Sequence, residues 1–239
     1  MADATGTLPE TWEDPRVVEG TRRQLAERDR MLAEGARRLG WKLGLGAPPA
    51  RERWGIKGPA AGFITDATLL GSGAAESLSG WEKPVLEAEV AVRVAVDSDG
   101  PRAGALGLSI ELADLGSGTD DLADVLAGDI FHRRTVLGPF DGDPTATVGT
   151  VAVERDGAEI DTATDPTALV GGTPAEMAAY LDRYLAGVGE ELRDGDVIIT
   201  GSTVPLVDCS KGGHFLVASP GLGSVEVTLA PTVFNMSAH

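Results

Sequence analysis

Hydrophobic and polar positions near the start of the chain follow a helical period. From about Asp14 to Leu39, apolar residues recur seven positions apart while arginine and glutamate occupy the other face, which predicts an amphipathic packing helix. Asp14 is placed to cap this helix and Pro15 to occupy its first turn, and Gly40 is expected to end it. The stripe expected to be buried contains Val18, Leu25, Leu32 and Leu39.

The rest of the chain consists mainly of short apolar or alternating runs bounded by glycine, proline and aspartate, a pattern typical of β-strands. A short acidic helix is expected over Thr119–Ala127, and a capping box at Thr173 and Glu176 predicts a second one, whereas residues 48–78 are expected to form loops and short strands. This mixture predicts an α+β domain with a heavily β core. The expected strands are 40–46, the run from 84, 106–114, 197–200, 215–218 and 224–229, with a hairpin turning at Asp156-Gly157.

Composition narrows the function more than the fold. The 239 residues are 42% hydrophobic and 24% charged, as in ordinary globular proteins. We expect a tail and helix over residues 1–39 and one β-rich catalytic unit over residues 40–239. The net charge of −17 disfavours binding to nucleic acid or to an anionic membrane surface. Cys209 is the single cysteine, and neither a secretory signal nor a stretch of ~20 apolar residues is present, so a cytoplasmic location is expected.

Candidate chemistry begins with Glu87 and Glu89, two positions apart in a strand-like run. Side chains at positions i and i+2 of a strand point to the same face, and carboxylates held so close raise each other's pKa unless a cation lies between them. A hard divalent ion such as Mg²⁺ would relieve that repulsion. A solvated strand face is the alternative, and the pair alone does not decide between the two.

Other single residues leave similar alternatives open. Glu111 interrupts an apolar run, where a carboxylate is costly unless it is paired, coordinated or at an exposed edge. Lys42 lies between bulky apolar neighbours; its head either reaches solvent or enters a cleft as a proton carrier or carboxylate clamp. His132 is a structural or an active-site histidine, and Arg133 receives an anionic substrate or balances nearby acidic groups.

Several segments in a fixed order carry a family resemblance. They are Gly40–Leu45, Gly55–Gly62, Glu87–Glu89, Ile110–Asp114, Gly195–Ser202 and Gly221–Val225. Together they resemble the fumarylacetoacetate hydrolase superfamily, and more closely its branch of 2-keto-4-pentenoate hydratases and 4-oxalocrotonate decarboxylases. Each motif alone is weak, but their order over roughly residues 40–229 makes chance a poor explanation.

The resemblance implies a mixed β-roll with an N-terminal helix and a few packing helices, assembled as a homodimer or larger homo-oligomer, or with a related subunit. It implies that Glu87, Glu89 and Glu111 hold Mg²⁺ or Mn²⁺, which binds the carboxylate and 2-oxo group of a small 2-oxo acid and stabilises its enolate. Lys42 matches the catalytic lysine, which assists proton transfer. The implied substrate-binding residues are Lys42, Gly62, Phe63, His132, Arg133, Thr200 and Ser202.

The expected function is therefore a metal-dependent lyase that hydrates a 2-oxo-4-enoate or decarboxylates an oxalocrotonate-like diacid, whose distal carboxylate His132 or Arg133 would recognise. Two differences from the hydratase motifs leave the type of reaction open. Ala60 stands where hydratases have an acidic residue, with Asp66 nearby in sequence, and residues 129–133 replace a polar stretch of those enzymes. The alternatives are an acylpyruvate-type C–C hydrolase, which normally needs a Glu-His pair near the amino terminus, and a non-catalytic binding homologue or partner subunit. No histidine precedes His132, which disfavours the hydrolase.

Overall fold

Two β-sheets form the centre of the protein. The computed structural model describes residues 7–116 and 118–232. In the larger, eight-stranded sheet the order is β2 (Ala60–Thr65), β1 (Arg38–Gly44), β10 (Val197–Ser202), β5 (Pro84–Asp97), β6 (Gly100–Asp114), β7 (His132–Leu137) and β3 (Leu69–Gly71), with β11 (Val207–Asp208) also paired to β5. In the smaller sheet it is β4 (Ala74–Ser77), β13 (Gly223–Ala230), β12 (Gly213–Ser219), β8 (Val151–Arg155) and β9 (Ala158–Ala163).

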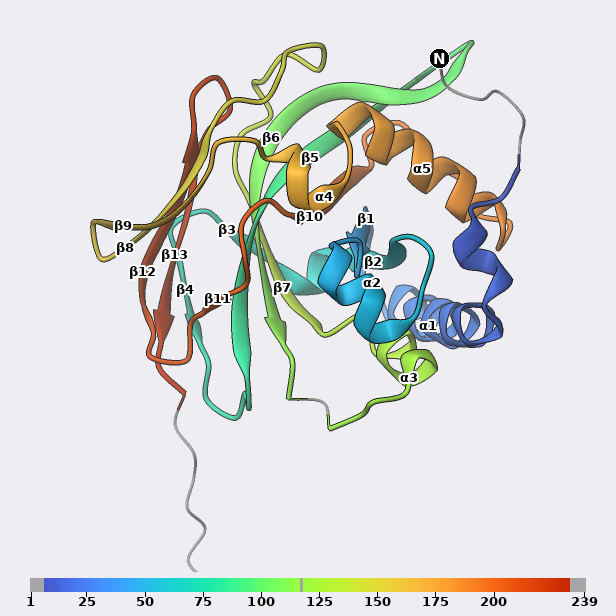
Figure 1. Ribbon diagram of the computed structural model, residues 1–239, viewed down its shortest axis with the longest axis horizontal. Helices are drawn as coiled ribbons and strands as arrows, with labels where there is room; N and C mark the ends of the chain where they lie inside the picture. The colour runs from blue at the N-terminus through green and yellow to red at the C-terminus, as the bar shows by residue number, and fades with distance from the viewer. Residues whose placement is uncertain (1–6, 117, 233–239) are drawn as a thin grey trace, which may run out of the picture.

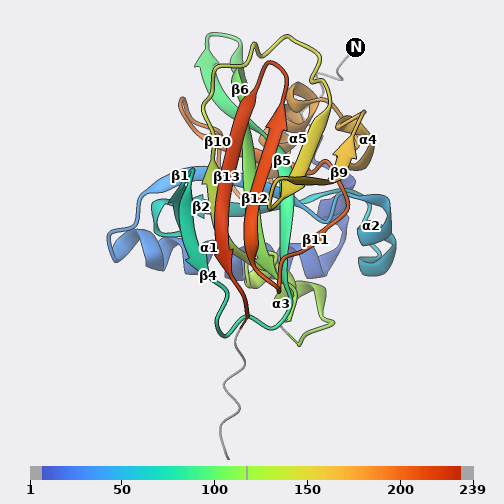
Figure 2. The ribbon, with the colours of Figure 1, turned by 90° about the vertical axis from the view of Figure 1, so that its left-hand side faces the viewer.

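Helices cover the side of the larger sheet that the smaller sheet leaves free (Figure 1). Figure 2 shows β12 and β13 lying in front of the long strands β5 and β6; β6 contacts both the smaller sheet and α5, and β5 contacts α5. This arrangement confirms the predicted α+β class with its β-rich core. The helices are α1 (Pro15–Ala33), α2 (Pro48–Trp54), α3 (Leu122–Ala127), α4 (Thr167–Val170) and α5 (Pro174–Ala186), with 3-10 turns η1 (Glu10–Glu13) and η2 (Asp66–Thr68).

The predicted helix caps and the predicted hairpin turn are confirmed. Asp14 caps α1 through its side chain, and Pro15 is the first helical residue. Thr173 and Glu176 form the predicted capping box at the start of α5. The hairpin between β8 and β9 turns at Asp156-Gly157, both of which have positive φ angles of 52° and 80°. In each case the deciding contacts lie within three or four residues, so the local pattern is sufficient.

The predicted end of the first helix is wrong, and its buried face is only partly as predicted, since Leu25 packs against the core but Val18 does not. α1 ends at Ala33, and Gly40 lies inside β1, where a Cβ would approach the carbonyl oxygen of Val197 to 1.9 Å. Val18 is 47% exposed, whereas the neighbouring Val17 is buried. The reason is Gly20, whose missing side chain lets α1 lie directly against α3. The buried face of α1 consists of Val17, Gly20, Thr21, Gln24 and Arg28.

Residues 48–78 contain a helix that the pattern did not predict. α2 is seven residues long, begins at Pro48 and stops at Gly55, whose φ of 68° is left-handed. Such a helix is shorter than the window of about 11–18 residues over which helical periodicity is recognised. Within the described residues, no helix combines the length and the apolarity needed to cross a membrane. The expected division of the chain at residue 39 and the expected homo-oligomer stay predictions.

Candidate active site

Strand pairing brings three carboxylates onto one face of the β5–β6 ladder. Glu87 lies directly opposite Glu111 in the register, and Glu89 lies two residues further along β5, opposite Ser109. Glu89 and Glu111 are 0% and 1% exposed. The alternative of a solvated strand face is therefore excluded for this pair of strands.

Lys42 reaches these carboxylates from β1. Its side chain is 2% exposed; Nζ forms an ion pair with Oε1 of Glu111 and donates a hydrogen bond to the carbonyl oxygen of Ile130 at 3.2 Å. Gly62, its partner on β2, leaves the space for this path, because a Cβ there would lie 2.7 Å from Cγ of Lys42. Burial lowers the pKa of Lys42, but attraction from Glu111 and two further carboxylates outweighs it and raises the pKa above its ordinary value. Lys42 is thus a buried, charged group and not a solvent-reaching edge residue.

One lysine charge does not neutralise three carboxylates, of which Glu89 and Glu111 are buried and Glu87 is half-buried. Burial, followed by repulsion from Glu111, raises the pKa of Glu87 to about 7. The pKa of Glu89 is raised well above its ordinary value by burial and then by repulsion from Glu111 and Glu87. Glu111 differs: burial acts to raise its pKa, but Lys42 and His132 outweigh burial and lower it to about 2. The cluster is therefore short of positive charge.

Glu89 also has an unused ligand atom. Its Oε2 accepts a hydrogen bond from the backbone N–H of Gly201 at 2.7 Å, whereas its Oε1 is buried without a hydrogen-bond partner. Within residues 7–116 and 118–232, no three His, Cys, Asp or Glu side chains already converge into a complete metal site, and Lys42 and His132 hold Glu111. The donor set nevertheless fits a hard divalent cation, since it offers carboxylate oxygens, an orphaned buried oxygen and uncompensated negative charge. Lys42 and His132 both contact Oε1 of Glu111, which leaves its Oε2 for an ion.

Residues 129–132, the first three of which are strained, contact Lys42 and Glu111. Asp129, Ile130 and Phe131 have φ angles of 58°, 52° and 65°, which is unfavourable for non-glycine residues. In this conformation the Ile130 carbonyl faces Lys42. His132, which follows, places Nδ1 2.8 Å from Oε1 of Glu111 and Nε2 3.1 Å from the hydroxyl of Thr68. Both ring nitrogens of His132 are therefore engaged.

Asp129 is a site residue that the sequence did not indicate. Its Oδ1 accepts a hydrogen bond from the N–H of Phe63 at 2.9 Å, and a Cβ on Gly62 would lie 2.5 Å from the same oxygen. Burial raises the pKa of Asp129 to about 6, against the opposing effects of His132 and Lys42. Asp66, in contrast, pairs with Arg37 at 2.7 Å. Asp129, and not Asp66, is thus the acidic residue that lies beside Gly62 and acts on Lys42.

Known proteins of similar sequence are hydratases, although no protein-family model matches the chain. The chain is 27% identical over 209 residues to 2-hydroxyhexa-2,4-dienoate hydratase of Comamonas testosteroni, with 82% of this chain and 79% of the relative covered. It is 29% identical over 221 residues to 2-keto-4-pentenoate hydratase of Burkholderia vietnamiensis, with 86% and 83% covered.

Solved structures share the fold. The 4-oxalocrotonate decarboxylase of Pseudomonas putida G7, complexed with magnesium and adipate, has a TM-score of 0.76 at 23% identity over 89% of this chain and 86% of that one. Fumarylpyruvate hydrolase of Pseudomonas aeruginosa, in complex with Mn²⁺ and pyruvate, has a TM-score of 0.61 at 18% identity, with 82% and 90% covered. These similarities support the resemblance to the fumarylacetoacetate hydrolase superfamily, and in particular to its hydratases and decarboxylases. The relatives of similar sequence are hydratases, which indicates that the chain is an enzyme.

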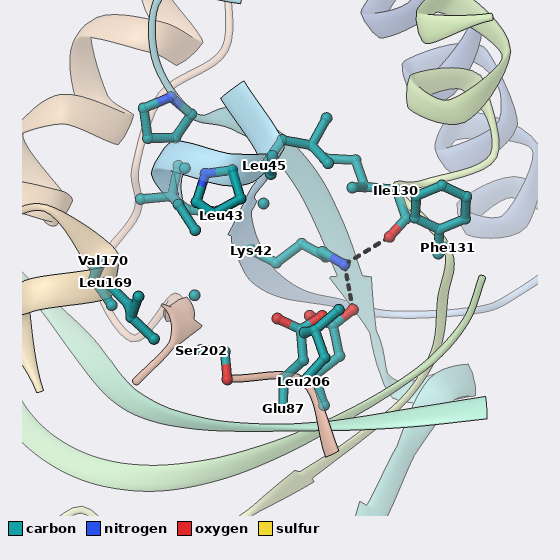
Figure 3. Close-up of a pocket in the computed structure, with 18 of the residues that line it drawn as sticks. Lys42, Leu43, Leu45, Glu87, Ile130, Phe131, Leu169, Val170, Ser202 and Leu206 are labelled. Carbon is teal, nitrogen blue, oxygen red and sulfur yellow. Dashed lines mark hydrogen bonds and ion pairs between the residues drawn. The ribbon is translucent and has the colours of Figure 1, made fainter. Parts of the chain in front are cut away.

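The protein has a cavity of about 540 Å³ above the carboxylates of Glu87 and Glu111. Figure 3 shows Lys42 pointing toward Glu87 at its floor. Thr200 and Ser202 also line the cavity, and their hydroxyls donate to the carbonyl oxygens of Val90 at 3.0 Å and Val204 at 2.7 Å.

Four residues predicted to bind substrate are not among the residues that line this cavity. Gly62 and Phe63 lie behind Lys42 on β2. His132 is buried against Glu111, and Arg133, half-exposed, lies 3.7 Å from Asp114. The structure therefore brings together the lysine, the three glutamates and the strand end of β10, and it places these four residues outside the cavity lining.

The charge imbalance predicts a pH-dependent stability of the metal-free protein. The folded pKa values of Glu87 and Glu89 lie above the unfolded value of about 4.5. Their destabilising effect is therefore absent below pH 4.5 and grows as the pH rises through each folded pKa, which is about 7 for Glu87. We expect the midpoint of thermal unfolding, measured with EDTA, to rise as the pH is lowered from 8 to 5. Saturating Mg²⁺ should make this rise smaller. Scanning calorimetry of the double variant Glu87→Gln/Glu89→Gln separates this effect from the general relief of net charge. An equally steep rise in the double variant would show that the pair is not responsible.

Proposed function

We propose that the protein is a divalent-metal-dependent lyase of 2-oxo acids, which hydrates a 2-oxo-4-enoate or decarboxylates an oxalocrotonate-like diacid. The observation that carries this proposal is the group formed by half-buried Glu87 with buried Glu89 and Glu111, which shares one lysine at the floor of a cavity large enough for a small organic acid. The names of the relatives, two hydratases and a decarboxylase, support the reaction class.

Glu87, Glu89 and Glu111 are the proposed ligands of the ion. Similar structures that contain magnesium, calcium or Mn²⁺ support a divalent cation without specifying which one. A bound ion would act as a Lewis acid on the 2-oxo group and make the neighbouring C–H more acidic. The backbone N–H of Gly201 would keep Glu89 oriented through Oε2, which leaves Oε1 for the ion.

Lys42 is the proposed proton carrier. With a metal on the carboxylates, Nζ would keep its hydrogen bond to the Ile130 carbonyl, and it is the only buried cation that lines the cavity in the described part of the chain. It can then bind the substrate carboxylate or, as a general acid, donate a proton to the carbon chain. Asp129, close behind Lys42, supplies negative charge that keeps the lysine protonated between turnovers.

The histidines give no support to the hydrolase alternative. A hydrolase needs a base to activate water. Both ring nitrogens of His132 are engaged, and His214 pairs with Glu226 at 3.0 Å on the smaller sheet. Neither histidine lines the cavity. Within the described residues, the groups available for proton transfer in the cavity include Lys42, Glu87 and Glu111, which are the groups of the lyase proposal.

Direct assay tests the proposal. We expect the protein with Mg²⁺ or Mn²⁺ to consume 2-hydroxypenta-2,4-dienoate or 2-oxohex-3-enedioate, seen as loss of dienol absorbance in the first case and as CO₂ release in the second. EDTA should abolish the reaction, and added Mg²⁺ should restore it. Failure to convert either compound with any divalent ion, by a protein that binds the ion, would contradict the proposal and favour a binding homologue.

A further inference from the structure

The cavity above Lys42 changes character with depth. Lys42, Glu87 and Glu111 lie together at its floor, where they meet the end of β10, whereas the other charged residues of the lining, Arg53 and Lys83, are exposed. Above them the walls are apolar and come from segments far apart in the sequence, so they are not the continuation of one core strand. Figure 3 shows Ile130 and Phe131 on one side of this space and Leu169 and Val170 on the other. We refer to this upper part as the apolar chamber; it is lined by Leu45, Trp54, Phe131, Leu169, Val170 and Leu206.

We infer that the substrate is a 2-oxo acid whose distal end is a bulky, uncharged apolar group, such as a branched alkyl chain or an aryl ring, bound in the apolar chamber. This inference rests on the proposed function and adds the substrate class. The 2-oxo acid head would lie at the carboxylates and Lys42, and the distal group would replace water against the apolar walls, which is favourable in proportion to the apolar area covered.

The volume of the cavity supports a large distal group. A water molecule takes up about 30 Å³ in the liquid, so a cavity of about 540 Å³ has room for many more atoms than a five-carbon acid supplies. With a five-carbon substrate, most of the apolar wall would remain in contact with water. Sites of this size typically enclose most of the surface of their ligand.

The distribution of cations disfavours a second carboxylate on the substrate. Besides Lys42, the cations that line the cavity within the described residues are Arg53 and Lys83, and both are exposed. Arg53 lies over the ring of Trp54 and pairs with Asp120 at 3.3 Å. A distal carboxylate in the apolar chamber would therefore be desolvated without a buried partner, which is costly.

Isothermal titration of the Mg²⁺-loaded protein tests the inference with three acids that share one head: 2-oxopentanoate, 2-oxo-4-phenylbutanoate and 2-oxohexanedioate. We expect the phenyl compound to bind about tenfold or more tightly than 2-oxopentanoate, since its ring buries additional apolar area, and the diacid to bind no more tightly than 2-oxopentanoate. Leu169→Arg should reverse the preference between the phenyl compound and the diacid. Ile160→Arg is the matched control, because Ile160 is 44% exposed on β9 and does not line the cavity.

The outcomes separate this inference from the proposed function. Tightest binding of the diacid, or equal binding of all three acids, would overturn the apolar substrate class and leave the lyase proposal standing. Binding of 4-phenylbutanoate as tightly as 2-oxo-4-phenylbutanoate would show that the 2-oxo group is not recognised and would overturn the proposed function. An unchanged preference in Leu169→Arg would remove the apolar chamber as its cause.

Discussion

Replacing Lys42 by methionine is expected to reduce kcat by roughly 10²–10⁴-fold, the range typical of a lost general acid or base, while metal affinity rises. Turnover falls because the variant has no buried cation on the cavity wall within the described residues. Metal affinity rises because the positive charge of Lys42, which lies against Glu111 and would repel a cation there, is removed. This opposite change in the two quantities distinguishes a proton carrier from a residue that merely supports the fold.

The same variant should be less stable without metal. Removing one partner of a buried ion pair typically costs about 3–5 kcal/mol because the other charge is left uncompensated. Thermal unfolding in EDTA and in Mg²⁺, isothermal titration with Mg²⁺, and initial rates measure the three effects. Lys57→Met is the control, since Lys57 is half-exposed and pairs with Glu13 at the surface. Turnover of Lys42→Met within a few-fold of the parent protein would exclude Lys42 from the chemistry.

How much of the site the sequence reveals depends on the separation of the residues that meet. Glu87 and Glu89 share a face because a strand has a period of two, and this needs no knowledge of the rest of the fold. That Glu111 faces Glu87 depends on the register of a long hairpin, and only the family resemblance indicated it. The contact between Asp129 and Phe63 joins residues 66 positions apart, and no local pattern encodes it.

The apolar chamber was missed for a related reason. Its walls come from the end of β1, from the short helices α2 and α4, and from loops around residues 130 and 205. Each contributes one or two apolar residues, which in sequence look like ordinary packing positions. The wrong prediction that Val18 is buried also has a non-local cause. Val17 and Val18 both fit an apolar stripe, and close packing of Gly20 against α3 decides which of the two is buried.

Glu89→Gln is expected to change metal affinity and metal-free stability in opposite directions. Affinity should fall by more than the roughly 10–100-fold typical of a lost residue behind a ligand, because the variant removes a charged ligand atom. Stability in EDTA at pH 8 should rise, because the buried carboxylate is penalised by burial and by repulsion from Glu111 and Glu87, and a neutral amide escapes both effects. The amide oxygen can still accept the hydrogen bond from Gly201. Each kcal/mol gained should raise the unfolding midpoint by about 2–4 °C.

Metal affinity and metal-free stability change in opposite directions because the carboxylates destabilise the metal-free protein but bind the ion. Evolution tolerates such a cost at functional positions, whereas a glutamate with a purely structural role would lose stability on the same change. Isothermal titration with Mg²⁺ or Mn²⁺ and thermal unfolding in EDTA provide the two readouts, and Glu159→Gln, at an exposed position on β9, is the matched control. Unchanged metal affinity in Glu89→Gln would remove Glu89 from the ligand set, and with it the assignment of the three carboxylates as a metal site.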